Sequence, residues 1–444
     1  MFAYISLAFL LLFGTVRADQ AEPNVVAAID ARADEFAAVA HSIWQYAELG
    51  YLEQQSSALL QVQLAVADFR IEQGVAGIPT AFIAERVSGR PVVALLAEFD
   101  ALPGLSQQAV AERRPSLLAS GCSGQVARAR SDSTVRQPKK EARGRSIWCV
   151  PDSLTMSTRC STGILRTATL PVRARPWPTS RRIRFHGIAT HAAMAPERGR
   201  SALDGVEAMN HMVNMMREHL PQDARVHYVI TRGGAAPNIV PEFAEVFYYV
   251  RHPIGKILPE LWDRVVKAAE GAALGTGTTM EYEVIHGNYN KLPNIALSGQ
   301  VDVNLRRVGG VEYTAEEKAF AQEIRTTLGR TKLALGSEAE IQPFAPWDSK
   351  GSTDVGDVSW MVPTSDLGTA TWVPGTASHS WQAAAVGGTD IGNKGMLVAA
   401  KVLALTAVDL FLRPDLSTRL CWGIGSRRWA IGSSGWPDRG IWVG

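Results

Sequence analysis

Four polar side chains, Asp100, His191, Asn238 and His379, stand where they could take part in chemistry. Imidazole and carboxylate groups bind divalent metals and transfer protons, and an amide can donate hydrogen bonds to a carboxylate. Each position also has a plain structural explanation: Asp100 as a turn cap, His191 at a helix entry, Asn238 in a turn and His379 as a polar loop residue. The chemical explanation depends on the elements that position these side chains.

Helix and strand patterns alternate around the first of these residues. Apolar residues recur at helical spacing from Asn24 to Val66, and the apolar run RPVVALLAEF then predicts a buried strand that ends at Asp100. Because strands and helices follow one another, the pattern predicts an α/β fold with a parallel or mixed sheet.

A second unit contains His191 and Asn238. The run RIRFHGIATH indicates a strand and a loop, and a helix is predicted to begin after Ser201, which would be its N-cap. Two strands around a Gly-Gly and Pro turn follow, and LPELWDRVVKAAEGAALGTG predicts another helix. These elements make an α+β unit of about 110 residues, a normal size for an inserted domain. The first pattern returns after Thr314 and includes the helix GNKGMLVAAKVLALTAVDLFL.

Charge is distributed unevenly along the chain. Of 45 Lys and Arg and 43 Asp and Glu residues, 13 basic and 3 acidic ones lie between Ser120 and Arg182, with three of the four cysteines. The remainder holds 32 basic and 40 acidic residues. The arginines of the basic segment show no helical stripe and no interleaved aromatic residues, which argues against nucleic-acid binding. We expect the segment to pack poorly, because a core cannot bury unpaired cations.

The N-terminal residues resemble an export signal. An apolar run from Ile5 to Phe13 is followed by Val-Arg-Ala, which places small residues where a signal peptidase reads them. Residues 1–18 are therefore predicted to be a signal peptide that is cleaved after Ala18. The run is too short for a membrane anchor. We expect an exported protein, periplasmic or secreted, with no membrane partner.

Three motifs occur in order: AEFDALPGLSQ, FHGIATHAAMAPERGRSALDGVEAMN, and GSTDVGDVSWMVPT followed by TASHSWQ. This arrangement resembles the zinc-type amidohydrolases and carboxypeptidases of metallopeptidase family twenty. The branch it resembles most contains the aminobenzoyl-glutamate and indoleacetyl-amino-acid hydrolases. The long middle motif is the most specific part of the resemblance.

The resemblance implies a two-domain α/β metallohydrolase. Its catalytic domain, expected over residues 19–182 and 295–412, has a mixed sheet and holds two divalent metal ions, expected to be zinc. An inserted α+β lid, expected over residues 183–294, forms a homodimer, and residues 413–444 are an atypical tail. In such enzymes a metal-bound water attacks the amide carbonyl and a glutamate takes its proton.

The resemblance also implies a role for each of the four side chains. His379 matches the last metal ligand, and Asp100 matches a carboxylate that orients a metal-binding histidine. Glu98 stands where other branches carry a ligand histidine, so Asp100 is not expected to bind metal itself. His191 matches the lid histidine that polarises the scissile carbonyl, commonly in the partner's active site. Asn238 matches a residue that binds the carboxylate end of the substrate.

The other ligands of the family are missing from this sequence. The family carries a Cys-Gly-His pair, a Glu-Glu pair and a further histidine after the aspartate strand. Between Asp100 and Phe185 there is no histidine, and Cys122 has no histidine beside it. His379 alone cannot hold zinc, which takes three or four ligands.

A change of reading frame accounts for this segment. When the third base of each codon is joined to the first two of the next, Arg128 to Ala142 can be read as GTVRFYGTPAEEGG, which contains the Glu-Glu motif. In the same way, Asp152 to Leu165 can be read as LFDDVDAVLHWHP, which contains the histidine motif. Two bases of every new codon are nearly fixed, so such long agreement is not expected by chance. We interpret residues 120–182 as frameshifted and aberrant.

Two hypotheses about function follow. The first is a metal-dependent amidohydrolase by descent that cleaves the amide bond of N-acyl or N-aroyl amino acids and is inactive as written. The alternative is a non-catalytic, dimeric, ligand-binding remnant. Both hypotheses predict a homodimer through the lid. A measurement of bound metal distinguishes them, because only the enzyme needs it.

Overall fold

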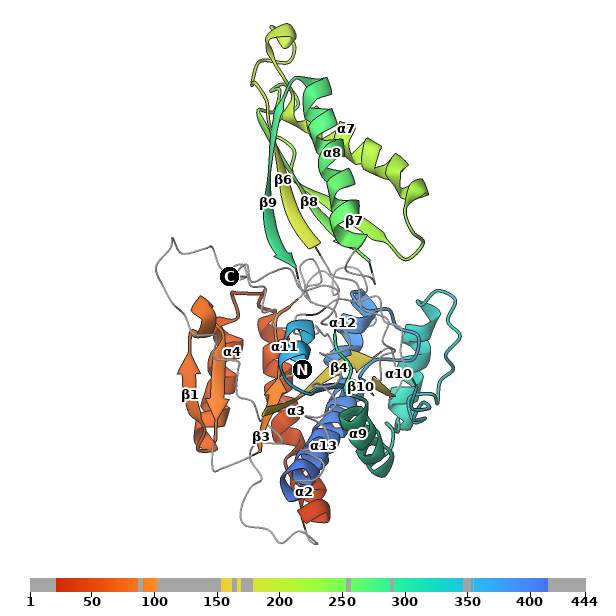
Figure 1. The fold of residues 1–444 in the computed structure, drawn as a ribbon. Helices are drawn as coiled ribbons and strands as arrows, with labels where there is room; N and C mark the ends of the chain where they lie inside the picture. The colour runs from red at the N-terminus through yellow and green to blue at the C-terminus, as the bar shows by residue number, and fades with distance from the viewer. Residues whose placement is uncertain are drawn as a thin grey trace.

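The structure, a computed structural model, describes residues 21–86, 91–101, 153–161, 166–168, 179–252, 257–287, 291–345, 353 and 355–413. The expected signal peptide, Cys122, and all but the first residue of the tail at 413–444 lie outside these residues. The described elements gather into two domains (Figure 1), for which we keep the names implied by the resemblance, catalytic domain and lid.

Helices at the start of the chain follow the predicted helical spacing. They are α2 (Ala21–Asp30), α3 (Ala33–Tyr46) and α4 (Gln54–Val66). Helix α3 begins with two acidic residues, which suit the positive end of the helix dipole, and buries Phe36 and Ile43. It ends at Ala47, which takes a left-handed conformation and donates its N–H to the carbonyl of Ile43.

The catalytic domain is built on a four-stranded sheet in the order β3-β4-β10-β5. Its strands are β3 (Val92–Leu96), β4 (Ser153–Ser161), β5 (Arg166–Ala168) and β10 (Thr364–Ala370). β4 pairs in parallel with β3 and with β10, whereas β5 pairs antiparallel with β10. The predicted α/β fold with a mixed sheet is confirmed.

Two of these strands lie in the segment that was expected to pack poorly. Ser153–Ser161 forms β4, which lies between β3 and β10, and Arg166–Ala168 forms β5 at the edge. Main-chain pairing places both strands in the sheet, because a strand is held by main-chain hydrogen bonds that every non-proline residue can make. The expectation of poor packing concerns the side chains and stays a prediction. Residues 179–182 begin a strand of the second domain, and the rest of 120–182 lies outside the described residues.

Helix α13 (Asp390–Leu412) runs through the core of the catalytic domain. It contacts α2, α3 and β10, and it also contacts α9 (Ile295–Val308). The helix is long and apolar enough to cross a membrane, but 78% of its most apolar window is buried inside the protein. That burial is typical of the core helix of a globular domain.

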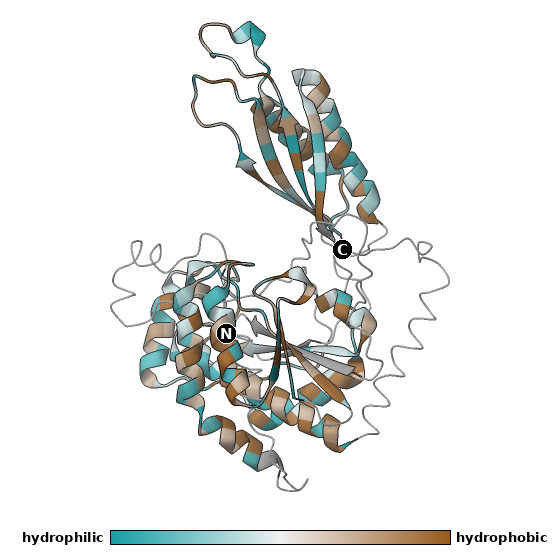
Figure 2. Ribbon diagram, turned by 90° about the vertical axis from the view of Figure 1, so that its left-hand side faces the viewer, coloured by the Kyte–Doolittle hydropathy of each residue, from teal (hydrophilic) through white to brown (hydrophobic). Residues whose placement is uncertain are grey.

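The lid is a four-stranded antiparallel sheet covered on one face by two helices (Figure 1). The strand order is β7-β8-β6-β9. The elements are β6 (Thr179–His186), β7 (Arg225–Arg232), β8 (Phe243–Arg251), β9 (Thr279–Gly287), α7 (Ala202–Met216) and α8 (Leu258–Thr276). Polar and apolar residues alternate along these strands (Figure 2). In β6, for example, Ile183 and Phe185 are fully buried beneath the helices.

The N-cap prediction for the first lid helix is confirmed. The Ser201 side chain accepts a hydrogen bond from the backbone N–H of Asp204, the arrangement that satisfies a free donor at a helix start. This cap fixes where α7 begins, immediately after the loop that carries His191.

Smaller elements complete the described part of the chain. They are β1 (Arg70–Gln73), β2 (Phe82–Glu85), α10 (Ala315–Thr326), α11 (Val355–Met361) and α12 (Trp381–Gly387), with short 3-10 helices at Val75–Gly77, Pro196–Arg198 and Arg217–His219. β1 and β2 form a separate antiparallel pair.

Candidate active site

The loop that carries His191 is held in place by a close approach of two backbones. Ile188 and Arg200 exchange two backbone hydrogen bonds at 2.8 and 3.0 Å, which closes the loop at its base. A Cβ added at Gly187 would lie 1.9 Å from the carbonyl oxygen of Arg200. Only glycine fits there, so Gly187, the first residue after β6, sets the start of the loop.

The structure brings His191 and Asn238 together. His191 forms an antiparallel bridge with Ile239, and the backbone N–H of Ala192 donates to the carbonyl of Asn238 at 2.9 Å. Both side chains are exposed to solvent. Residues 47 positions apart in the sequence thus lie on neighbouring segments at one edge of the lid.

A local hydrogen bond selects the tautomer of His191. The backbone N–H of Ala193 donates to Nδ1 of His191 at 3.2 Å. In a neutral imidazole one ring nitrogen accepts and the other carries the proton, so the proton lies on Nε2. His191 can therefore donate a hydrogen bond from Nε2 to a carbonyl oxygen while remaining uncharged.

His379 lies in the connection between β10 and α12. Its backbone φ is 60°, a left-handed conformation that is uncommon for a residue other than glycine, and its side chain is exposed. Thr376, three residues before His379, is buried. Ser380 follows and caps α12 by accepting a hydrogen bond from the N–H of Ala383. The loop therefore places His379 at the surface, just before the start of α12.

Asp100 is buried at the end of the predicted strand segment, with 3% of its surface exposed. The next residue, Ala101, forms a parallel bridge with Leu49 and donates its N–H to the carbonyl of Glu48 at 2.6 Å. A Cβ added at Gly50 would lie 3.5 Å from Oδ2 of Asp100, so the turn after α3 packs directly against this carboxylate.

Two acidic residues of that turn were missed in the sequence. The Glu48 carboxylate accepts hydrogen bonds from the N–H groups of Gln55 and Ser56, at 2.9 and 2.8 Å, and so satisfies free donors at the start of α4. Glu53 is 2% exposed and accepts a hydrogen bond from the Thr80 hydroxyl at 2.7 Å. In the sequence, the two glutamates flank Gly50, and a glycine between acidic residues could have indicated a turn here.

Sheet topology relates Asp100 to His379. Because β3, β4 and β10 run parallel, their carboxyl ends lie at one edge of the sheet, where ligands of α/β proteins commonly bind. Asp100 follows β3 and His379 follows β10, so both chain segments leave the sheet at this edge. The two residues are in the catalytic domain, and His191 and Asn238 are in the lid.

The donor atoms in the described part of the chain do not fit a two-metal site. Among residues 21–413, apart from the undescribed stretches, no three His, Cys, Asp or Glu side chains come together so as to hold a metal ion. Cys122 and Glu141, which lie in the segment interpreted as frameshifted, are outside the described residues. His379 is therefore the one matched ligand that the structure places.

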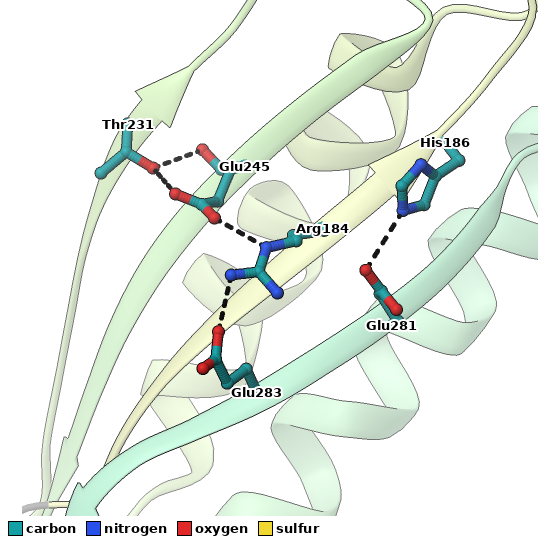
Figure 3. A network of polar contacts seen from close by, with 6 residues as sticks. All are labelled: Arg184, His186, Thr231, Glu245, Glu281 and Glu283. Atoms are coloured by element: carbon teal, nitrogen blue, oxygen red, sulfur yellow. Dashed lines mark hydrogen bonds and ion pairs between the residues drawn. The ribbon is translucent and has the colours of Figure 1, made fainter. Parts of the chain in front are cut away.

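A charged network crosses the open face of the lid sheet (Figure 3). Arg184 bonds Glu245 at 2.8 Å and Glu283 at 2.6 Å, and the Thr231 hydroxyl donates to Glu245 at 2.8 Å. Burial acts to raise the pKa of Glu245, but the hydrogen bonds from Thr231 and Arg184 outweigh it, so its pKa is lowered. The network keeps Glu245 ionised on the strand that leads back from the Asn238 loop.

Comparisons with known proteins agree with this arrangement. The family model of the M20 peptidase dimerisation domain matches residues 179–332. One of the subunits of p-aminobenzoyl-glutamate hydrolase from Escherichia coli K12 is 36% identical over 446 aligned residues, covering 88% of this chain and 92% of the relative. The Xaa-Arg dipeptidase of Mus musculus is 27% identical, covering 87% and 88%.

A solved structure shows the same fold. The aminobenzoyl-glutamate utilization protein from Klebsiella pneumoniae superimposes with a TM-score of 0.53 at 17% identity. The match covers 87% of this chain and 98% of the other. This likeness extends over most of both chains and supports the predicted fold class.

Proposed function

The chain belongs to metallopeptidase family M20, and from that premise we propose that it descends from an enzyme that hydrolyses N-acyl or N-aroyl amino acids of the aminobenzoyl-glutamate kind. By family it is an amidohydrolase, a hydrolase that acts on amide C–N bonds. The observation that carries the substrate proposal is the backbone pairing that places His191 beside Asn238.

These two lid residues suit the two polar ends of such a substrate. Nε2–H of His191 would donate to the amide carbonyl oxygen and stabilise the negative charge that develops there. The Asn238 side chain would donate to the carboxylate of the amino acid. An N-acyl amino acid carries both groups within a few bonds of each other, which matches two donors on adjacent segments.

The hydrolytic step in this family needs divalent metal, which we propose to be zinc in intact relatives of this chain. Zinc supplies a bound water of lowered pKa and polarises the carbonyl. His379 would be one ligand, and Asp100 would orient another. Since no three ligand side chains converge among the residues that the structure describes, we propose that the chain as written does not hydrolyse amides.

The frameshift interpretation explains the missing ligands. The readings that contain Glu-Glu and histidine fall in 128–165, and part of this segment occupies the sheet as β4, next to β3 and β10. In the restored frame, residues at the carboxyl end of β4 would stand between the segments of Asp100 and His379.

The shortage of metal-ligand side chains among the described residues favours a second candidate function. This is a dimeric protein that binds its ligand without cleaving it. The lid elements that carry His191 and Asn238 are complete in the described structure, whereas the ligand set is not. We also propose a homodimer through the lid, for which the dimerisation-domain match is the support, and export by way of residues 1–18.

Two chains should be compared: the chain as written and a chain whose segment 107–185 is restored to the family frame, including the Cys-Gly-His loop. Elemental analysis and hydrolysis of p-aminobenzoyl-glutamate are measured for both. We expect about two metal ions and chelator-sensitive turnover in the restored chain only. Stoichiometric metal with turnover in the chain as written would refute its inactivity. A restored dimer that binds the ligand without metal or turnover would support the binding protein.

A further inference from the structure

The chain returns from the lid to the catalytic domain through a connection whose described residues are buried. β9 ends at Gly287 and α9 begins at Ile295, and within this connection residues 291–294 are described and all are buried. A connection between two domains commonly runs over the surface as an exposed linker. The burial of this one indicates that it is fixed to the catalytic domain.

An ion pair inside the protein anchors the connection. Lys291 pairs with Asp366, and the two side chains are 2% and 1% exposed. Asp366 is in the middle of β10, where its backbone lies opposite Ser157 of β4 and Ala168 of β5. Charges this deep are retained only when they are paired, because separating them would leave each one desolvated.

Neighbouring polar contacts hold the same short segment. The backbone N–H of Leu292 donates to the hydroxyl of Ser359 in α11 at 2.7 Å. Asn294 caps α9 by accepting from the N–H of Leu297, and Ser298 shares a hydrogen bond with Ser365, the residue before Asp366. Consecutive residues of β10 thus contact the connection and the first turn of the helix that follows it.

We propose that the Lys291–Asp366 ion pair locks the root of the lid to β10, the strand that leads to His379, so that the position of the lid and the His379 loop are coupled. The pair sets a position because a buried charge has one low-energy partner, whereas an apolar side chain can pack in several ways. The lock links the lid, which carries His191 and Asn238, to the catalytic domain independently of metal and of turnover.

Distance measurement between the two domains tests the lock. Spin labels are attached through keto amino acids at Leu274 in α8, which is 87% exposed, and at Val66 in α4, which is 80% exposed; the native cysteines need no change. Double electron–electron resonance gives the distance distribution of the full chain. We expect one narrow distribution in the parent chain and a broadened or shifted one in Lys291→Met.

A second readout follows the connection itself. The amide of Leu292 should exchange about tenfold faster or more in Lys291→Met, while amides of the lid strand β8 keep their parent rates. Asn304→Ala is the matched control. It removes buried hydrogen bonds to Thr406 and Asp409 in the same catalytic core without touching the connection. We expect it to lower stability and leave the distance distribution unchanged.

The double variant Lys291→Met/Asp366→Leu covers the case in which the single variant does not fold. Replacing a buried ion pair by apolar residues commonly preserves stability. We expect this variant to fold with a broadened or shifted distribution, which would separate positioning from stability. A parent-like distribution in the folded double variant, or a change of equal size in Asn304→Ala, would overturn the proposal.

Discussion

Ala192 donates its backbone N–H to the carbonyl of Asn238 at 2.9 Å. Together with the bond from Val240 to the carbonyl of Thr190, also 2.9 Å, it holds the segment around His191 against the connection between β7 and β8. The neighbouring bridge between His191 and Ile239 fixes the register. Because both partners are main-chain groups, the relative position of the two functional side chains is set by the loops and not by their own contacts.

Replacement of His191 by Ala in the frame-restored chain should reduce kcat by about 10²–10³-fold, the usual effect of losing one oxyanion donor. Asn238→Ala should act mainly on KM, since it would remove a contact to the carboxylate in both ground and transition states. Steady-state hydrolysis of p-aminobenzoyl-glutamate measures both. His211→Ala, an exposed histidine of α7, is the control and should be silent. Full activity of His191→Ala would show that its role is misassigned.

Gly187→Ala should destabilise the lid by about 1–3 kcal/mol or more, because the new methyl group would meet backbone atoms that cannot rotate away. Gly275→Ala is the matched control. Its added Cβ meets nothing within 4 Å, and the residue lies inside α8, so alanine should stabilise by about 0.5–1 kcal/mol. Urea unfolding, followed by methyl NMR signals of Ile183 in the lid core, compares the two. Equal effects would show that the close approach at Gly187 is not rigid.

The contribution of Glu245 to lid stability should depend on pH. Its pKa is lowered in the folded protein, so its stabilising effect is complete above the unfolded-state value of about 4.3 and is lost as pH falls through the lower folded value. Glu245→Gln should therefore be less stable than the parent lid at pH 7, and the difference should shrink below about pH 4. The same urea experiment at several pH values measures this.

Glu281→Gln is the control for that experiment. Glu281 pairs with His186 at 3.4 Å on the same sheet face, and both side chains are largely exposed (Figure 3). Exposed pairs contribute little, so we expect a change within about 0.5 kcal/mol. A difference for Glu245→Gln that stays constant from pH 7 to pH 3 would contradict an ionised, hydrogen-bonded Glu245.

Ser201→Ala should cost the lid about 1 kcal/mol, because it leaves the N–H of Asp204 without its cap. Ser42→Ala is a suitable comparison, since the Ser42 hydroxyl donates to the carbonyl of Ala38 within the same helix and caps no helix end. Thermal or urea unfolding should show a loss in the first variant and little change in the second. If both variants kept parent stability, the observed cap would contribute nothing to the fold.

Local signals in the sequence were enough to predict much of the fold. Ser201 was predicted as an N-cap from its residue type and position, and the mixed sheet from the alternation of strands and helices. The pairing of His191 with Ile239 could not be predicted, because it depends on contacts between segments about fifty residues apart. Glu48 and Glu53 were missed for a related reason: their hydrogen bonds define a turn that has no periodic pattern.

The position of β4 could not be predicted from the residues it contains. Ser153–Ser161 has only three apolar residues, Leu154, Met156 and Cys160, whose alternation is a weak strand signal, and the charge of its surroundings argued for poor packing. Its place between β3 and β10 arises from backbone pairing with strands on either side. Side-chain patterns are therefore a weak guide where neighbours already supply two hydrogen-bonding edges.

The parallel pairing of β4 has a consequence for how such a gene can decay. The ladder uses only amide and carbonyl groups, which every residue except proline supplies in any reading frame. A lineage can therefore lose the residues that perform a reaction in one mutational step and still inherit a strand of suitable length between the same two neighbours. The fold is then retained after the catalytic activity is lost, and the folded protein can be selected for another role.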